Sequence, residues 1–245
     1  MENNAIGIIP ARYASSRFPG KPLARIGSKT LIECVYERVM GASLKHVAVA
    51  TDDRRIADCV ESFGGTVVMT SPHHPSGTDR CREAAEHFSP GNDDVIVNIQ
   101  GDEPFISGRE ISLLTSAFSE KEVCIATLAN SSATKTPAEN PNSVKVVTAL
   151  NGNALYFSRA PIPYRRDASS EPPHLLRHVG IYAYRFGTLK KITELRPSRL
   201  ELCEKLEQLR WLENGYSIRV LECDYEGIGV DTPEDLELIK DKLIK

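Results

Sequence analysis

AIGIIPARYASSRFPGKPL, residues 5–23, joins an apolar segment directly to a loop of small and cationic residues. The first six residues are apolar without alternation, which is typical of a parallel strand buried on both faces. Open α/β sheets bind ligands at the carboxyl ends of such strands. The loop there presents backbone N–H groups together with Arg12, Arg17 and Lys21, which suit phosphate. The stretch therefore predicts an α/β sheet with a phosphate site, although a solvated surface loop would have the same composition.

The loop differs from two common nucleotide-binding motifs. A Walker A loop has Ser or Thr after its Gly-Lys pair, whereas Pro22 follows Gly20-Lys21, and Ser15 stands where the first glycine belongs. No GxGxxG fingerprint follows the strand either. A P-loop kinase and a nicotinamide-dependent dehydrogenase are therefore both disfavoured.

The strand is the first of five short apolar runs in the amino-terminal half. They occupy residues 5–10, 47–51, 66–70, 94–100 and 123–129. Amphipathic segments of helical length lie between them, at residues 31–42, 54–63, 80–88 and 110–118. This alternation predicts parallel strands in a doubly wound, Rossmann-like and mostly parallel sheet of the α/β class.

Residues 131–222 have a different pattern, which predicts an inserted α+β lobe. The expected strands are 144–150, 154–157, 177–185 and 217–222, and the expected helices are 186–194 and 200–214. Residues 1–130 and 223–245 would form the core of a single domain, 1–245, whose last helix follows Asp231. A polar, proline-rich loop at 160–175 is expected to be a mobile cover or a contact arm.

Composition excludes several classes of protein. With 41% hydrophobic and 26% charged residues among 245, the chain is an ordinary globular protein. A net charge of −3 provides no broad basic surface for nucleic acid or an anionic membrane. The six cysteines form no CxxC motif, and no apolar run has the length of a signal peptide or a membrane span. A cytoplasmic protein is expected.

Two aspartates point to a divalent cation. Asp102 follows an apolar strand in QGDEP (100–104), and Asp231 follows Gly229-Val230 before the last helix. Mg²⁺ prefers a few carboxylates together with phosphate oxygens, so this pair beside the basic loop suits a nucleotide-dependent transfer. Each aspartate could instead cap the turn or helix that follows it.

A small polar stretch follows the third strand. Ser76 and Arg80 are candidates for ligand contacts, whereas Thr78 or Asp79 is expected to cap a helix. His73-His74 lacks the surrounding ligands that zinc requires, and adjacent side chains in an extended loop diverge. A zinc site is therefore not expected.

Cations, acids and amides gather in the predicted lobe. They are Arg159, Arg177, His178 and Tyr182 around the proline-rich loop, and Glu204, Glu207, Gln208 and Arg210 in the following helix. Such a set suits an acidic sugar. A solvated helix face and a structural histidine are the alternatives.

An ordered set of motifs runs through nearly the whole chain. The motifs are IIPAR (8–12) through GKPL (20–23), SGTDR (76–80), QGDEP (100–104) and GVDTPEDL (229–236). Further ones are NPN (140–142), VKVV (144–147), ALYFSRA (154–160), RHVGIY (177–182) and LEQLR (206–210). Together they resemble the CMP-Kdo synthetases, the family of 3-deoxy-manno-octulosonate cytidylyltransferases. The resemblance implies a fold of the nucleotide-diphospho-sugar transferase type, with a nucleotide-binding core and a lobe for sugar binding and dimerisation.

The same resemblance implies a Mg²⁺-dependent reaction of CTP with Kdo, which gives pyrophosphate and CMP-Kdo for lipopolysaccharide assembly. Catalysis would depend on Arg12, Lys21, Asp102 and Asp231, of which the two aspartates would hold Mg²⁺. The nucleotide would contact Pro10, Ala11, Arg12, Ser15, Lys21, Ser76, Arg80 and Gln100. Kdo would contact Gln100, Arg159, His178, Tyr182, Glu207 and Gln208. A homodimer is also implied, with neither nucleic acid nor membrane as a partner.

Two rival functions have similar requirements. A CMP-sialate-type cytidylyltransferase would also need a pocket for the carboxylate of a 2-keto sugar. A nucleotide-sensing binding protein could have the same fold without turnover. Uridylyl- and guanylyltransferases are disfavoured because the motif set resembles the cytidylyl family.

Overall fold

The computed structural model describes residues 5–14, 17–131, 139–167, 175–227 and 229–243. Its strands are β1 (Ala5–Pro10), β2 (Arg25–Ile26), β3 (Lys29–Thr30), β4 (His46–Thr51), β5 (Val67–Met69), β6 (Val95–Asn98), β7 (Ile125–Asn130), β8 (Lys145–Thr148), β9 (Ala154–Ser158), β10 (Leu176–Arg185) and β11 (Arg219–Cys223). Its α-helices are α1 (Leu31–Met40), α2 (Arg54–Ser62), α3 (Gly77–Glu86), α4 (Gly108–Ser116), α5 (Phe186–Thr193), α6 (Arg199–Glu204), α7 (Gln208–Glu213) and α8 (Pro233–Leu243). Two 3-10 turns are η1 (Lys21–Leu23) and η2 (Ala117–Ser119).

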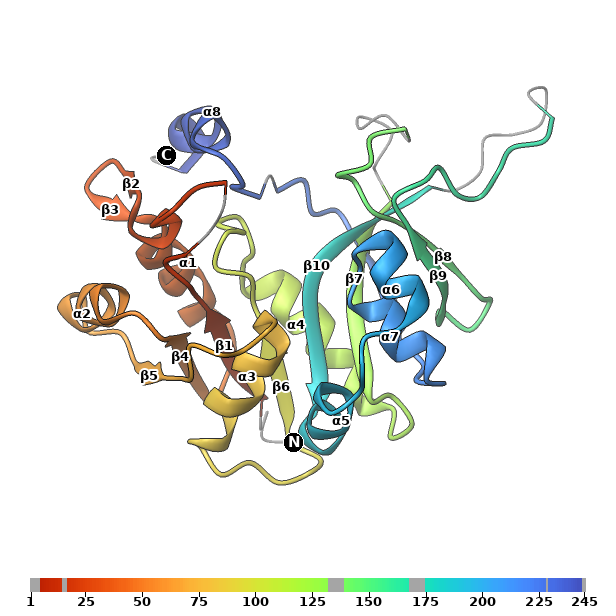
Figure 1. Ribbon diagram of the computed structural model, residues 1–245, viewed down its shortest axis with the longest axis horizontal. Helices are drawn as coiled ribbons and strands as arrows, with labels where there is room; N and C mark the ends of the chain where they lie inside the picture. The colour runs from red at the N-terminus through yellow and green to blue at the C-terminus, as the bar shows by residue number, and fades with distance from the viewer. Residues whose placement is uncertain (1–4, 15–16, 132–138, 168–174, 228, 244–245) are drawn as a thin grey trace.

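A nine-stranded sheet crosses the molecule in the order β11-β7-β10-β6-β1-β4-β5, with β8 and β9 joined to it at β10 (Figure 1). β1 is parallel to β4 and β6, β4 is parallel to β5, and β7 is parallel to β11. β10 is antiparallel to both of its neighbours, β6 and β7. The sheet is therefore mostly parallel along this path, as expected. The five strands predicted in the amino-terminal half are not contiguous, however, because β10 from the second half lies between β6 and β7.

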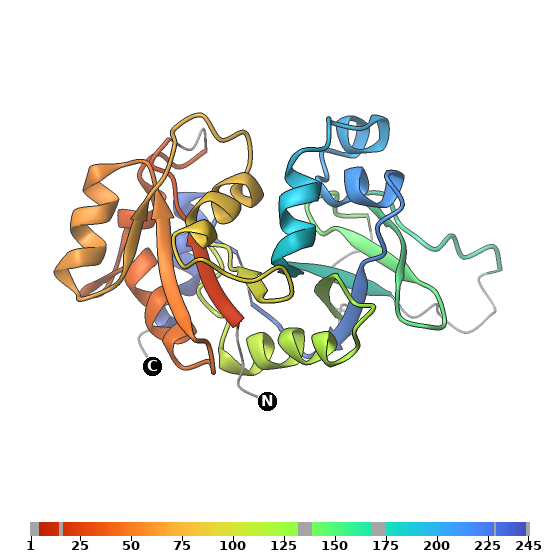
Figure 2. The same cartoon turned by 90° about the horizontal axis from the view of Figure 1, so that it is seen from below.

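Consecutive side chains of β1 enter two different hydrophobic cores. Ile8 belongs to a cluster with Ala84 of α3 and Leu189 of α5. Ile9 belongs to another cluster, with Val35 of α1 and Leu114 of α4. Figure 2 shows α5 and α4 on opposite sides of the sheet. Helices on both faces explain why the strand is apolar without alternation.

The start of α3 differs from the prediction. The helix begins at Gly77 rather than at residue 80, and its N-cap is Ser76 rather than Thr78 or Asp79. The Ser76 hydroxyl accepts a hydrogen bond from the N–H of Asp79 at 3.2 Å, which satisfies a donor of the first turn.

The prediction of a single helix over residues 200–214 is wrong. The structure has two short helices there, α6 and α7. Lys205 has a left-handed backbone with a φ of 54°, which ends α6. The break places Glu207 at the N-terminus of α7 instead of in the middle of a long helix.

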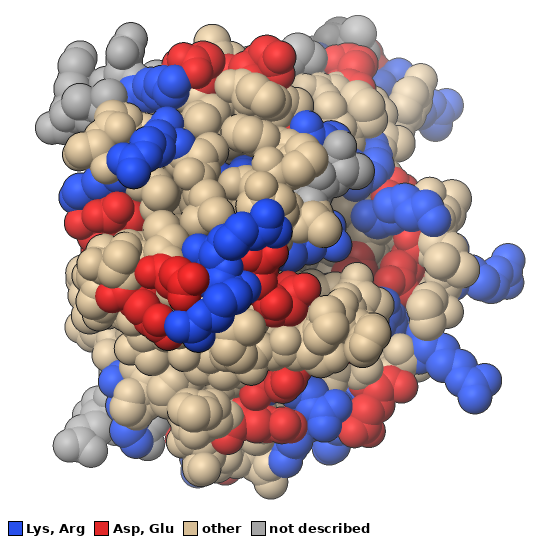
Figure 3. Space-filling model, turned by 60° about the vertical axis from the view of Figure 1, so that its left-hand side comes forward, with Lys and Arg blue, Asp and Glu red and all other residues tan. Residues whose placement is uncertain are grey.

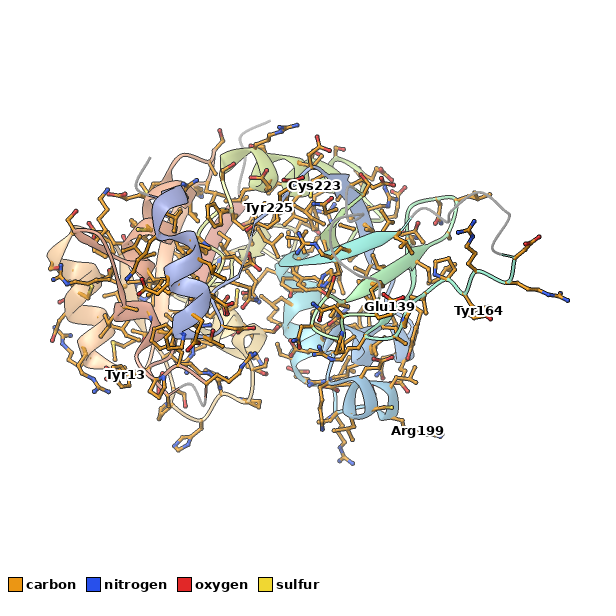
Figure 4. All side chains as sticks on the ribbon, turned by 90° about the horizontal axis from the view of Figure 1, so that it is seen from above. Tyr13, Glu139, Tyr164, Arg199, Cys223 and Tyr225 are labelled. Carbon is orange, nitrogen blue, oxygen red and sulfur yellow. The ribbon has the colours of Figure 1, made fainter. Side chains whose placement is uncertain are left out.

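Part of the predicted lobe belongs to the central sheet, since β10 and all of β11 except Cys223 lie within residues 131–222. The division into a core and a lobe stays a prediction. The proposed cover or contact arm at 160–175 follows β9, and its residues 168–174 lie outside the described part of the chain. Tyr164, on its described portion, is 87% exposed and projects at one end of the molecule (Figure 4).

The described helices include none with the length and apolar character needed to cross a membrane. On the face shown in Figure 3, Lys and Arg side chains are interspersed with Asp and Glu. That face therefore presents no broad surface of a single charge.

Candidate active site

A cavity of about 250 Å³ lies beyond the carboxyl ends of β1 and β6. Segments far apart in the sequence meet there: the loop after β1, the start of α3, the loop after β6 and Asp231, two residues before α8. The predicted nucleotide and metal residues that line it are Pro10, Ala11, Arg12, Lys21, Ser76, Arg80, Gln100, Asp102 and Asp231. Ser15, also predicted to contact the nucleotide, lies outside the described residues.

Gly20 shapes the cationic loop. Its φ of 70° is left-handed, and a Cβ at this position would lie 3.0 Å from the ring of Tyr13. The Gly20 N–H donates to the carbonyl oxygen of Tyr13 at 2.9 Å, so the loop folds back on itself. The Tyr13 ring also packs against Arg55, with 3.4 Å between the guanidinium Cζ and the ring centroid. These contacts hold the loop from which Lys21 reaches the cavity.

Lys21 joins the two predicted metal ligands. Its Nζ lies 2.6 Å from Oδ2 of Asp102 and 3.8 Å from Oδ1 of Asp231. It also donates to the carbonyl oxygen of Val230 at 2.7 Å. The guanidinium of Arg17 donates two hydrogen bonds to Asp231, of 3.0 and 2.9 Å. Two carboxylates and two cations therefore meet at one place on the cavity wall.

Neither aspartate caps the helix that follows it: the Thr232 hydroxyl accepts from the Asp235 N–H at 3.3 Å at the start of α8, and Ser107 is the N-cap of α4. The Asp235 carboxylate accepts hydrogen bonds from the N–H groups of Asp231 and Thr232, at 3.0 and 2.9 Å. The Val230 N–H donates to the backbone carbonyl of Asp102 at 2.8 Å, which ties the two acidic loops together. The side chains of Asp102 and Asp231 are thus left for the cavity.

The two carboxylates fit a Mg²⁺ ion that is shared with a substrate. Both supply the hard oxygen donors that Mg²⁺ prefers. The Lys21 ammonium contacts both, so the place between them already suits a cation. Among the described residues, no group of three or more His, Cys, Asp or Glu side chains could hold a metal. Phosphate oxygens and water would complete the coordination.

Glu103 lies next to this pair, and the motifs assigned it no role. Its Oε2 accepts a hydrogen bond from the Tyr225 hydroxyl at 2.7 Å, and Tyr225 lies near the middle of the molecule in Figure 4. Burial, together with the charge of Asp102, raises the pKa of Glu103 to about 7 in spite of the opposing effect of the Tyr225 hydrogen bond. Glu103 could have been identified as a site residue from its position beside Asp102, whereas nothing in the sequence identifies Tyr225 as one.

Ser76 and Arg80 line the cavity, but both side chains also form hydrogen bonds or ion pairs with other residues of the protein. The Ser76 hydroxyl donates to Oδ2 of Asp79 at 2.6 Å. Arg80 is 5% exposed, donates to the Thr70 hydroxyl at 2.6 Å and forms a 2.9 Å ion pair with Asp52. The Arg80 guanidinium is therefore held in a fixed orientation, which the sequence did not reveal.

The residues predicted for the acidic sugar include a group on β10 beside the cavity. Gln100 connects the nucleotide cavity with β10. It lines the cavity, and a Cβ placed on Gly180 of β10 would lie 3.9 Å from the Gln100 Cγ. The rings of His178 and Tyr182 lie 5.3 Å apart. His178 Nε2 is 3.0 Å from the hydroxyl oxygen of Thr127. Burial lowers the pKa of His178 to about 3, so its imidazole is neutral at neutral pH.

Four buried polar atoms near this group have no hydrogen-bond partner among the described residues. They are Oη of Tyr182, Oη of Tyr184, Nε1 of Trp211 and Oδ1 of Asn98. Trp211 packs edge to face on both tyrosines, with ring centroids 5.2 and 5.6 Å away. Orphaned polar atoms are rare in protein interiors and indicate water or a polar ligand.

Glu207 and Gln208 lie at the start of α7 and face the protein. Oε2 of Glu207 accepts a hydrogen bond from the Thr78 hydroxyl at 2.6 Å, and burial raises the pKa of Glu207. Gln208 and Arg210 are only 5% and 8% exposed, and Arg210 donates to Glu201 at 2.8 Å. This part of the chain is therefore not a solvated helix face.

Arg159 is anchored by backbone carbonyls. Its guanidinium donates to the carbonyl oxygens of Glu204 at 2.7 Å and Pro141 at 2.9 Å. Its own N–H donates to the Glu204 carboxylate at 2.9 Å. The structure thus joins Arg159 to the end of α6, and Arg159 is not among the described residues that line the cavity.

The fold and the cavity, with its paired carboxylates and cations, define a nucleotidyltransferase of the α/β class. The profile of the Cytidylyltransferase family matches residues 6–219. A 3-deoxy-manno-octulosonate cytidylyltransferase from Bacteroides thetaiotaomicron is 54% identical over 239 residues, which cover 95% of each chain. One from Porphyromonas gingivalis is 52% identical over 244 residues, 97% of this chain and 95% of the relative. The chain belongs to the family of 3-deoxy-manno-octulosonate cytidylyltransferases.

Solved structures agree with this family. A CMP:2-keto-3-deoxy-manno-octonic acid synthetase complexed with CTP is 43% identical and superposes with a TM-score of 0.91 over 98% of both chains. A 4-diphosphocytidyl-2C-methyl-D-erythritol synthase from Anaerococcus prevotii is 13% identical, with a TM-score of 0.61 over 98% of both chains. The second similarity shows the fold alone.

Proposed function

We propose that the chain transfers CMP from CTP to 3-deoxy-D-manno-octulosonate (Kdo), giving CMP-Kdo and pyrophosphate. The observation that carries this proposal is the contact of Lys21 with both Asp102 and Asp231 on the wall of the cavity. This arrangement suits a triphosphate and its divalent cation. Relatives are named for this reaction, and one solved relative is complexed with CTP. The product would be the activated sugar for lipopolysaccharide assembly.

The nucleotide would lie in the cavity, with its phosphates against the loop after β1. Arg12, Arg17 and Lys21 would neutralise the triphosphate, and Mg²⁺ held by Asp102 and Asp231 would supply further neutralisation of phosphate charge. Arg17 and Lys21 are paired with these aspartates in the structure. Nucleotide binding would therefore exchange ion pairs within the protein for contacts with phosphate.

The base and ribose would lie toward the start of α3. Pro10, Ala11, Ser76 and Arg80 border that part of the cavity. The bonds of Arg80 to Thr70 and Asp52 would keep its guanidinium in place while the cytidine binds.

The anomeric hydroxyl of Kdo would attack the α-phosphorus in line. A P–O bond to the sugar forms while the bond to the β-phosphate oxygen breaks, and the hydroxyl proton is released to water. The enzyme forms no covalent intermediate in this scheme, so positioning and charge stabilisation supply the catalysis. Arg12 and Lys21 would stabilise the charge that grows on the leaving pyrophosphate.

The sugar would bind between β10 and α7. Tyr182 has a buried hydroxyl without a partner among the described residues, and His178 is neutral, so both can bond sugar oxygens. Glu207 and Gln208 supply acceptors and donors from α7, and Gln100 lies at the junction with the nucleotide cavity. Arg159 would contact Kdo from the side of the loop after β9.

A homodimer in the cytoplasm is part of the same proposal, with neither nucleic acid nor a membrane as a partner. Leu155 on β9 and Leu200 and Leu202 on α6 are exposed large apolar side chains. Exposed apolar residues in the 131–222 region suit an interface with a second copy. Sedimentation equilibrium of wild type and Leu202→Glu tests this assignment.

Pyrophosphate release in the presence of CTP and Mg²⁺ tests the proposed reaction. Kdo should give release, whereas a sialic acid, omission of the sugar, or Kdo with a chelator should not. Release with sialic acid alone would transfer the function to the CMP-sialate type. CTP binding without release from any sugar would instead identify a nucleotide sensor.

A further inference from the structure

One hydrogen bond crosses from the nucleotide side of the site to the sugar side. Thr78 lies in the first turn of α3, next to Ser76 and Gly77, which line the nucleotide cavity. Its hydroxyl donates to Oε2 of Glu207 at 2.6 Å, between residues 129 positions apart. Thr78 is 4% exposed, so water has little access to this hydroxyl. The bond therefore joins α3 to α7 in a largely enclosed environment.

Glu207 depends on this bond for its orientation. It stands at the N-terminus of α7 but makes no side-chain capping bond to its own helix. Its Oε1 lies 4.0 Å from Nη2 of Arg210, and that guanidinium is already bonded to Glu201. The 2.6 Å bond from Thr78 is thus the shortest contact of the carboxylate, and the Ser76 hydroxyl of the same turn adds to it, since it lowers the pKa of Glu207 as Thr78 does.

The oriented carboxylate lies near the orphaned polar atoms of β10. Trp211, one turn further along α7, packs on the rings of Tyr182 and Tyr184 with centroids 5.2 and 5.6 Å away, and the charge of Glu207 raises the pKa values of both tyrosines after the larger effect of burial. Neither tyrosine hydroxyl has a partner in full hydrogen-bond geometry among the described residues, although the hydroxyls of Thr127 and Thr78 lie close enough to Tyr182 and Tyr184 to lower their pKa values. Glu207 therefore faces a buried polar region that can receive sugar hydroxyls.

We propose that Thr78 is a positioning residue that fixes the Glu207 carboxylate for the acidic sugar and makes sugar binding depend on the nucleotide-binding turn of α3. The proposal rests on the proposed function, in which Glu207 contacts Kdo. Thr78 shares one helical turn with Gly77, so the two residues move together. A nucleotide bound against Ser76 and Gly77 steadies this turn, and through Thr78 it steadies Glu207.

Kinetics of Thr78→Val and Thr78→Ser test the proposal. Valine has nearly the shape of threonine but no donor, and serine keeps the donor. Loss of a hydrogen bond to a charged group should raise the KM for Kdo about tenfold to a hundredfold in Thr78→Val. The Kd for CTP, measured by calorimetry without sugar, should stay within about twofold. Thr78→Ser should restore most of the KM, which a role in packing alone would not explain.

Thr115→Val is the matched control on α4, where the hydroxyl donates to the Ser112 carbonyl of its own helix at 3.2 Å. It should leave both constants unchanged. Thr78→Val should also add little to the KM effect of Glu207→Gln, because Thr78 acts through Glu207.

An unchanged KM for Kdo in Thr78→Val would overturn the proposal, as would equal weakening of CTP and Kdo binding. Full additivity with Glu207→Gln would overturn it as well. Wild-type enzyme without Kdo-dependent pyrophosphate release would overturn the proposed function and this inference with it. Normal wild-type release with normal Thr78→Val kinetics overturns this inference alone.

Discussion

Glu103 should make the free energy of unfolding fall as the pH rises from about 4.5 to about 7. Burial is the main cause of its raised pKa, and the charge of Asp102 adds to it. In this pH range the unfolded chain has released the Glu103 proton while the folded protein still holds it, so a higher pH favours unfolding. A rise of this size, from 4.5 to about 7, corresponds to at most about 3 kcal/mol, which is lost in full above pH 7.

Urea unfolding without divalent cations, at about pH 5 and about pH 8, measures this effect. Glu103→Gln cannot ionise but still presents an acceptor to Tyr225. Groups other than Glu103 titrate alike in this variant and in wild type, so their contributions cancel when the two unfolding free energies are subtracted. It should shift in favour of the variant by up to about 3 kcal/mol between the two pH values. Tyr164→Phe, on an exposed loop, is the control and should follow wild type.

Tyr225→Phe is a second perturbation of the same group. The Tyr225 hydrogen bond lowers the pKa of Glu103, so its loss should destabilise the protein more at about pH 8 than at about pH 5. The extra loss should be about 1.5–3 kcal/mol, the range for a hydrogen bond to a charged group. Equal pH dependence of wild type and Glu103→Gln would refute the reasoning, because it would show that the Glu103 carboxyl is not desolvated.

Further substitutions test the site and its support. Asp102→Asn or Asp231→Asn should lower turnover by about two orders of magnitude or more without changing the circular dichroism spectrum; wild-type rates would reject the metal assignment. Gly20→Ala should cost about 1 kcal/mol of unfolding free energy and raise the KM for CTP, because its φ of 70° disfavours a side chain; unchanged kinetics and stability would contradict this. Arg210→Met should cost about 3 kcal/mol in urea unfolding, because it leaves the enclosed Glu201 carboxylate unpaired, and Glu201→Gln in the same chain should recover part of the loss.

Local sequence patterns predicted much of the central sheet. The run of apolar residues at 5–10 is β1, and QGDEP (100–104) places Asp102 four residues after the end of the adjacent parallel strand, β6. The carboxyl ends of adjacent parallel strands lie at one edge of the sheet, so the basic loop and Asp102 could be placed together before any coordinates. The positions predicted from the motifs for CTP and the metal line one cavity, apart from Ser15 in an undescribed part of the chain.

Local sequence patterns gave wrong helix boundaries where the backbone departs from regular helical geometry. Residues 200–214 have a helical composition, but Lys205 in a left-handed conformation divides them into α6 and α7. A lysine does not signal such a break, because glycine and asparagine are the residues that usually adopt this conformation. The N-cap of α3 was expected at Thr78 or Asp79 but is Ser76, which also lines the cavity.

The sequence by itself determined the class of fold, the cationic loop after β1 and the family, because each of these is expressed in residues that are near neighbours along the chain. Tertiary structure alone decided the insertion of β10 between β6 and β7, the burial of Glu103 against Tyr225 and the bond from Thr78 to Glu207. Each of these joins segments that are distant in sequence. Their contacts and pKa shifts depend on how much water the packed elements exclude, and no periodicity or motif carries that information.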